Sequence, residues 1–269
     1  MSDLRVGRIS ALNMYPIYHH LEQARLPGVT FTDGLPAALN AAVIGGDLHV
    51  SAMSSIEYAR NADRLRLLPV GCIACEGAVD SIRLLSPVPL GDVTRVAVTP
   101  HSASSVTLLR ILLGPAVPFR VLDGPAADAI ARGDAVLLIA DEALEAHRDG
   151  LAPHSIDLGE LWQQQTGLPM VFAVWAARED AARVREAEVA ALSVAIDEAR
   201  TAYLTDPESV AAHAAGRFPF PEQYIRQYLS RLSYAFGPAE RAGLARFLEL
   251  ARAAGELDDI PVITTPVAA

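Results

Sequence analysis

The sequence contains no lysine, and all 22 of its basic residues are arginine. A chain without lysine cannot form a Schiff base with a substrate, which excludes pyridoxal-phosphate chemistry and Schiff-base aldolases. The lysine of a nucleotide-binding P-loop is missing as well, which argues against the common NTPase design. Because the net charge is −10, we also expect no nucleic-acid partner.

Long apolar runs and cysteines are scarce too. No stretch reaches the roughly 18 uncharged apolar residues of a transmembrane helix, so we expect no membrane span. The start, MSDLRVGRIS, lacks the pattern of a secretory signal, which predicts a cytoplasmic protein. The two cysteines, Cys72 and Cys75, lie in an apolar segment that predicts a strand, where residues three apart point to opposite faces. We therefore expect two buried, inert thiols, and neither a zinc site nor a redox pair.

What the sequence does contain is an α/β pattern. Hydrophobic residues make up 51% of the chain, enough for a substantial core. Short apolar segments alternate with helical ones, which predicts parallel sheets with right-handed crossovers. The predicted strands cover residues 4–10, 30–32, 47–53, 65–74, 79–86, 95–98, 119–122, 135–140 and 170–176.

Proline and glycine after residue 86 predict a division into two lobes. Pro87, Pro89 and Gly91 interrupt the pattern there. We expect lobe 1 to comprise residues 1–86 and 178–269 and lobe 2 to comprise residues 87–177, with hinges near Ser86 and Pro169 and a ligand cleft between them. The chain after residue 178 should be helical and pack on lobe 1, with helices at 181–204, 207–215, 221–233 and 238–254.

Two serine-rich turns stand where a predicted strand leads into a helix. Ser102, Ser104 and Ser105 follow the strand 95–98 and open the helix 103–113. Unpaired N–H groups, hydroxyls and the positive end of the helix dipole form an anion site there. Serine is also an ordinary N-cap, so the same residues fit a purely structural role.

The second turn, Ser54 and Ser55, follows the strand 47–53. Ser54 and Glu57 have the spacing of a capping box, so we expect Glu57 to turn back on its own helix. Asn13 follows the first strand in the same way. Ligands of open α/β sheets bind at the carboxyl ends of the strands, so these turns suit a dicarboxylate held between two lobes. Asp141 is expected to be the N-cap of a helix beginning at Glu142, and not an acid catalyst.

Several blocks of the sequence resemble the chorismate dehydratases, which open the futalosine route to menaquinone. The blocks span roughly residues 4–178 in order, and so are more specific than any single motif. They read GRISALNMYPIYH, SSIEYAR, VDSIRLLS, VAVTPHSASSVTLLRILL and TGLPMVFAVWAAR. In the turn where the family often has Ser-x-Thr-Ser, Ser104 replaces the threonine and keeps the hydroxyl.

The resemblance implies a type II periplasmic-binding-protein fold with a helical C-terminal segment on lobe 1, used as an enzyme without metal or cofactor. The implied substrate is the dicarboxylate chorismate, which loses water to give 3-[(1-carboxyvinyl)oxy]benzoate. Asn13 is the candidate catalytic residue beside the reacting ring. The candidate substrate-binding residues are Ser54, Ser55, Ser81, Ser102, Ser104 and Ser105; Ser81 also fits an ordinary strand serine.

The sequence leaves the general base open. A base assisted by Asn13, the substrate's own enolpyruvyl carboxylate and His101 all remain candidates. Two other functions stay open as well: a solute-binding or sensor module of the same fold without catalysis, and the sister enzyme cyclic dehypoxanthine futalosine synthase. The oligomeric state is not predicted.

Overall fold

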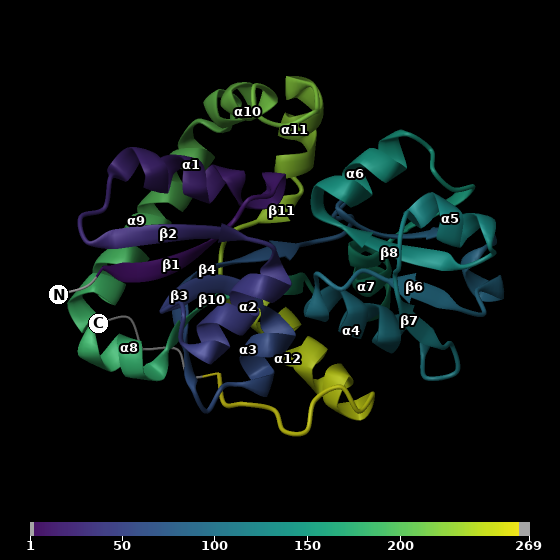
Figure 1. Ribbon diagram of the computed structural model, residues 1–269, viewed down its shortest axis with the longest axis horizontal. Helices are drawn as coiled ribbons and strands as arrows, with labels where there is room; N and C mark the ends of the chain where they lie inside the picture. The colour runs from purple at the N-terminus through teal and green to yellow at the C-terminus, as the bar shows by residue number, and fades with distance from the viewer. Residues whose placement is uncertain (1–2, 264–269) are drawn as a thin grey trace.

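The computed structural model describes residues 3–263, whose strands form two separate sheets lying side by side (Figure 1). We call the six-stranded sheet and its helices lobe 1, and the five-stranded sheet and its helices lobe 2. The strands of lobe 1 are β1 (Leu4–Ile9), β2 (Val29–Gly34), β3 (Val50–Ser54), β4 (Leu65–Cys75), β10 (Met170–Arg178) and β11 (Leu232–Ser233). Those of lobe 2 are β5 (Ile82–Ser86), β6 (Val96–Val98), β7 (Phe119–Val121), β8 (Ala135–Ile139) and β9 (His154–Asp157).

In lobe 1 the strand order is β11-β4-β10-β3-β1-β2. Strand β1 runs parallel to β2, from Leu4 opposite Val29 to Ile9 opposite Gly34, and parallel to β3 on its other side. This is the parallel arrangement that the alternating pattern predicted. Strand β10 runs antiparallel between β3 and β4, and it is almost entirely buried because it lies at the centre of the sheet.

In lobe 2 the strand order is β7-β6-β8-β5-β9. Strand β6 runs parallel to β7 and β8, whereas β5 runs antiparallel to β8 and β9. Strand β9 is not among the predicted strands. His154, Ser155 and Asp157 are polar, and the segment is a strand through its pairing with β5 at the edge of the sheet.

The lobe boundaries differ from the predicted ones. Strand β5, which we assigned to lobe 1, pairs within the second sheet, and β10, which we assigned to lobe 2, pairs within the first. The chain therefore crosses between the sheets at residues 76–81, where Gly77 (φ 92°) and Asp80 (φ 58°) turn it. The Asp157 carboxylate accepts the backbone N–H groups of Val79 and Asp80 and fixes this crossing. The prolines after Ser86 lie in a loop of lobe 2 and mark no boundary.

Helices cover both sheets (Figure 1). In chain order they are η1 (Leu12–Met14), α1 (Tyr15–Ala24), α2 (Pro36–Gly45), α3 (Ser55–Arg60), η2 (Leu90–Asp92), α4 (Ala103–Leu113), α5 (Ala126–Ala131), α6 (Ala140–Arg148), α7 (Leu158–Thr166), α8 (Glu179–Val184), α9 (Glu186–Thr205), α10 (Pro207–Ala215), α11 (Glu222–Leu229) and α12 (Pro238–Ala253). The predicted helix 181–204 is broken at Arg185, and the predicted helix 221–233 ends at Leu229 because Leu232 and Ser233 pair with β4.

The helical C-terminal segment packs on lobe 1, as predicted. Helix α9 lies against α1 and β4, and α12 lies against β10. The apolar stripe of α12 is fully buried, with Leu244, Phe247 and Leu248 facing inward. Helix α12 also reaches lobe 2, where the Phe247 ring lies 6.2 Å from the ring of Trp162 on α7. The tail therefore contributes to the contact between the lobes.

The two cysteines are free and buried, as predicted. Burial raises the pKa of both thiols, which keeps them protonated and unreactive. Among residues 3–263 the structure contains no helix that is both long and apolar enough to cross a membrane.

Candidate functional site

A cavity of about 490 Å³ lies between the lobes, at the carboxyl ends of strands from both sheets. Lobe 1 contributes residues that follow β1, β2 and β3, and lobe 2 contributes the starts of α4 and α6. This is where open α/β sheets place their ligands. The polar lining residues are Ser10, Asn13, Asp33, Ser54, Ser81, His101, Ser102, Ser105, Asp141 and Glu142. Apolar side chains such as Ile9, Ile82 and Phe172 form the remaining wall.

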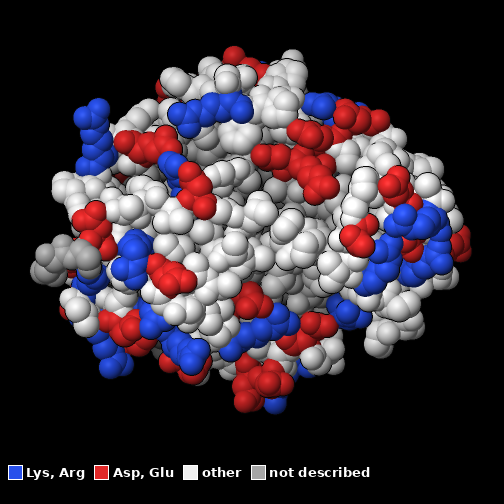
Figure 2. Space-filling model, viewed as in Figure 1, with Lys and Arg blue, Asp and Glu red and all other residues white. Residues whose placement is uncertain are grey.

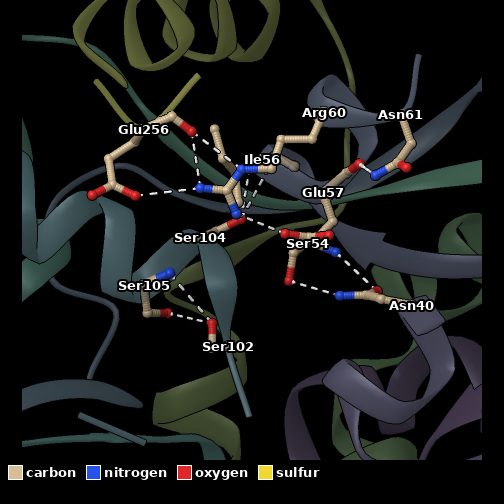
Figure 3. Close-up of polar contacts among 11 residues, drawn as sticks. Asn40, Ser54, Ile56, Glu57, Arg60, Asn61, Ser102, Ser104, Ser105 and Glu256 are labelled. Atoms are coloured by element: carbon tan, nitrogen blue, oxygen red, sulfur yellow. Dashed lines mark hydrogen bonds and ion pairs between the residues drawn. The ribbon is translucent and has the colours of Figure 1, made fainter. Parts of the chain in front are cut away.

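The start of α4 presents two of the predicted serines to the cavity. Ser102 is the N-cap, and its Oγ accepts the Ser105 backbone N–H at 3.3 Å. The Ser102 hydroxyl donates to Ser105 Oγ at 2.8 Å, so its own proton is used (Figure 3). The Ser105 hydroxyl proton has no acceptor among the described residues. The capping role and the ligand-facing position therefore coexist, and Ser105 holds a free donor.

Ser54 ends β3 and lines the cavity, but it does not form the predicted capping box. Its side chain makes no cap hydrogen bond, and Glu57 pairs instead with Arg60 at 2.7 Å. Buried Asn40 of α2 holds Ser54 from behind: the Asn40 amide donates to Ser54 Oγ at 3.3 Å (Figure 3). The hydroxyl proton of Ser54 has no acceptor among the described residues.

Ser55 and Ser104 are buried and do not line the cavity. The Ser55 hydroxyl donates to the Val171 carbonyl at 2.8 Å, so Ser104 must donate to Ser55 Oγ, 3.0 Å away. Ser104 Oγ also accepts the Ile56 backbone N–H. Both protons are used, and the pair connects α3 of lobe 1 to α4 of lobe 2. Each of the two serine turns therefore has two roles. Ser54, Ser102 and Ser105 line the cavity, whereas Ser55 and Ser104 form the contact between the lobes.

Asn13 lies in η1 and lines the cavity. Its side-chain oxygen is buried and has no hydrogen-bond partner among the described residues. The backbone carbonyl of Asn13 accepts the Tyr234 hydroxyl at 2.7 Å, which anchors η1 from the C-terminal segment. A buried amide oxygen without a partner is costly unless a ligand supplies the donor. Asn13 is thus positioned to accept a hydrogen bond from a bound molecule.

Ser81 lies at the crossing between the lobes. It lines the cavity at the start of β5, directly after Asp80 with its positive φ. The Ser81 carbonyl accepts the Ala140 backbone N–H at 2.7 Å, which links this crossing to the start of α6. Ser81 is therefore held on lobe 2 close to the first turn of α6.

The prediction that Asp141 is a helix N-cap is wrong. Helix α6 begins two residues earlier than predicted, with Ile139 as its N-cap, so Asp141 does not cap it. Instead Asp141 lines the cavity, and its Oδ1 accepts the Leu12 backbone N–H of lobe 1 at 3.1 Å. Burial raises the pKa of this carboxyl group, partly offset by that hydrogen bond. Its place just after the buried strand β8, like that of the serines after their strands, was the signal in the sequence.

The lining carries negative and neutral groups but no arginine. Burial also raises the pKa of Glu142, against the influence of His101. Asp33 is paired with Arg8 at the rim, where hydrogen bonding to that guanidinium lowers its pKa. Acidic side chains border the central hollow of the surface (Figure 2). Any anion bound here must depend largely on hydroxyls and backbone N–H groups, because the lining residues that the structure describes include no arginine.

Within residues 3–263 no group of three or more histidine, cysteine, aspartate and glutamate side chains could hold a metal ion.

Comparison with known proteins places this chain among related sequences. The family described as menaquinone biosynthesis matches residues 4–253. A chorismate dehydratase of Thermus thermophilus is 34% identical over 255 residues, covering 88% of this chain and 91% of that protein. A 1,4-dihydroxy-6-naphtoate synthase of the same organism is 26% identical over 269 residues, covering 95% of this chain and 96% of that protein.

Solved structures are also similar to this one. One is the Candida albicans CA3427 gene product, described as having the generic periplasmic binding protein structural fold. It superposes with a TM-score of 0.68 and 12% identity, covering 94% of this chain and 91% of that one. At this level of identity the likeness shows the fold alone.

Proposed function

The chain belongs to the menaquinone biosynthesis family, and on that premise we propose that it is a chorismate dehydratase. The observation that carries this proposal is the 34% identity to a chorismate dehydratase along nearly the whole of both chains. The cavity between the lobes supports it, because it combines free hydroxyl donors with an apolar wall. The proposed product is 3-[(1-carboxyvinyl)oxy]benzoate, the first intermediate of the futalosine route.

We assign the binding of the two substrate carboxylates to the polar ends of both lobes. Ser105, which the Ser102 hydroxyl orients, holds one carboxylate from lobe 2 together with the backbone N–H groups at the start of α4. Ser54 and Ser81 are placed to donate to the other. Hydroxyls and a helix N-terminus bind carboxylates without a cationic side chain. Ser55 and Ser104 act behind them, by keeping α3 and α4 together.

The reaction needs charge stabilisation more than a strong base. The C3 proton of chorismate is vinylogously activated by the ring carboxylate, so its removal moves negative charge onto that group. Donors already aimed at the carboxylate stabilise this charge as it develops. Loss of the C4 hydroxyl then makes the ring aromatic. Asn13, with its unpartnered oxygen, accepts a hydrogen bond from the ring hydroxyl and orients it.

The base that takes the C3 proton is proposed to be the substrate's own enolpyruvyl carboxylate or His101. A neutral amide is a poor base, so Asn13 serves orientation. His101 lines the cavity beside Ser102 and keeps its place as the protein candidate.

Two other functions compete with this one. The first is a 1,4-dihydroxy-6-naphtoate synthase, because a relative with that name matches 95% of this chain. It takes the place of cyclic dehypoxanthine futalosine synthase as the alternative enzyme. A binding module without catalysis is the second, since the fold alone does not imply chemistry.

Incubation of the purified protein with chorismate tests the proposal. We expect an aromatic product with the mass of chorismate less one water. If chorismate raises the melting temperature but is not consumed, the protein is a binding module. If it is neither bound nor consumed, the alternative enzyme is favoured.

A further inference from the structure

Asp141 and Asn13 line the same cavity from opposite lobes. Asp141 Oδ1 accepts the N–H of Leu12, the residue before Asn13, so the carboxyl group and the amide line the same part of the cavity. Asp141 comes from lobe 2 and Asn13 from lobe 1. Only one carboxylate oxygen is used by this contact, which leaves Oδ2 without a hydrogen-bond partner among the described residues.

The backbone before Asp141 is held in an uncommon conformation. Ala140 has a φ of 53°, in the left-handed region that non-glycine residues seldom adopt. The Ala140 N–H donates to the Ser81 carbonyl, which fixes this turn to the crossing between the lobes. Such strain is concentrated at functional sites, where the surrounding structure imposes it. Here it sets the direction in which α6 presents Asp141.

A carboxylate in this cavity is at odds with a dianionic substrate. An ionised Asp141 would repel both carboxylates of chorismate, and no arginine in the lining would compensate for it. A protonated Asp141 removes the repulsion and becomes a hydrogen-bond donor.

We propose that Asp141 is a further catalytic residue, which binds substrate in its protonated form and donates its proton to the C4 hydroxyl as that group leaves. This inference rests on the proposed function. The C3–H bond breaks and its proton goes to the base, and its electron pair forms the new ring double bond. The C4–O bond breaks, and the departing oxygen takes the Asp141 proton to become water. The proton on the base then returns to Asp141, so only water is lost and nothing is oxidised.

The charged and titratable groups around Asp141 favour its protonated form. Burial has the largest effect, and the negative charge of Glu145 one turn along α6 raises the pKa further. Glu142 lies beside it with His101 opposite. From the C-terminal segment, the buried Tyr228 of α11 faces the same region and stays neutral because burial raises its pKa. The Leu12 N–H and the positive end of the α6 dipole lower the pKa of Asp141.

The test compares the wild type with Asp141→Asn, whose amide oxygen still accepts the Leu12 N–H. The kcat for chorismate is measured from about pH 5 to about pH 9, and we expect a loss of about a hundredfold or more, as for other general acids. KM should change little. The wild-type kcat should fall as pH rises through the pKa of Asp141, and the variant should lose this alkaline limb. Melting temperatures and binding of the product show that the variant is folded and its cavity intact.

The control variant is Glu145→Gln, which does not touch the cavity lining. It should keep the maximal kcat and move the alkaline limb to lower pH, because a charge that raises the pKa of Asp141 is removed. An active wild type with an Asp141→Asn variant that keeps its kcat, or keeps the alkaline limb, overturns this inference alone. A wild type without turnover overturns the proposed function, and this inference with it.

Discussion

At the scale of single residues, the candidate site residues differ in whether their hydrogen-bonding groups are already satisfied. Asn13 has a buried oxygen without a partner, and Ser105 has a hydroxyl proton without an acceptor. In Ser55 and Ser104, by contrast, both the hydroxyl proton and the hydroxyl oxygen have partners. A group that is unsatisfied in the free protein is available to a ligand, so this difference separates binding from structure more sharply than residue type does.

Replacing Asn13 should affect turnover more than binding. Asn13→Ala removes a group that we place against the ring hydroxyl, where contacts matter most in the transition state. We expect kcat to fall about a hundredfold, comparable to the loss of one oxyanion-hole group, with a smaller change in KM. Steady-state kinetics on chorismate measure both. If kcat is kept and only KM rises, Asn13 is a binding residue.

Ser105→Ala should have the opposite signature. A hydrogen bond to a charged group contributes about 1.5 kcal/mol or more, so KM should rise about tenfold while backbone donors remain. The same kinetics report it, and kcat should stay close to that of the wild type. A fall in kcat without a change in KM would contradict the assignment of Ser105 to carboxylate binding.

Replacing the neighbouring residue, Ser104, should mainly lower the stability of the folded protein. Ser104→Ala leaves the Ile56 N–H without its acceptor and removes the hydrogen bond donated to Ser55 Oγ, both in the interior. We expect a loss of about 2 kcal/mol, or about 4–8 °C in Tm, with a smaller change in KM than for Ser105→Ala. Thermal unfolding of the two variants side by side is the measurement. An unchanged Tm with a raised KM would return Ser104 to the substrate site.

At the scale of elements, α12 lies unusually close to the chain that enters β10. A Cβ on Gly243 would lie 2.0 Å from the Pro169 carbonyl oxygen. Glycine is unfavourable inside a helix, and here close packing on the second crossing requires it. The position of Gly243 therefore ties the C-terminal segment to the connection between the lobes.

Gly243→Ala should destabilise the protein by about 2–3 kcal/mol, because backbone atoms must move to admit the methyl group. Gly45→Ala is the matched control: Gly45 ends α2 and has open space around its Cα. The control should keep or slightly raise the melting temperature, since alanine favours helix. Denaturant unfolding of both variants measures the difference. Equal stability would show that α12 does not pack as described.

At the scale of the whole molecule, few polar contacts hold the two lobes together around the cavity. They include the Leu12–Asp141 hydrogen bond and the ion pair of Asp80 with Arg231, at 2.8 Å. On the opposite side Glu256 pairs with Arg60 of α3 (Figure 3). Glu256 also pairs with Arg110 of α4. Partly exposed ion pairs of this kind contribute little, about 0–1 kcal/mol each.

We therefore predict that the lobes separate and close about the crossings at 76–81 and 167–169. Binding of the product should favour the closed arrangement, since residues from both lobes line the cavity. Small-angle scattering should show a smaller radius of gyration with saturating product than without it. Benzoate, with one carboxylate, serves as the control ligand. Identical scattering curves for free and product-bound protein would contradict lobe closure.

The sequence by itself predicted the features that depend on local interactions. The apolar strands, the starts of α4, α10 and α12 and the position of serines at strand ends follow from periodicity, capping and turn chemistry. The buried cysteines and the buried stripe of α12 followed from the same reasoning. The resemblance then indicated the fold and the substrate class, because many blocks in order are more specific than any one turn.

The tertiary structure alone decided which sheet each strand joins and which polar groups meet. Strand β5 follows the lobe 1 strands in sequence, yet it pairs with β8 and β9. Its hydrogen-bond partners come from segments far along the chain, which a local pattern does not identify. Ser104 and Ser105 are neighbours, but the rotation of α4 turns one to the lobe contact and the other to the cavity. Asp141 and Asn13, 128 residues apart in the chain, line one cavity because the two lobes meet there, and no local pattern encodes that approach.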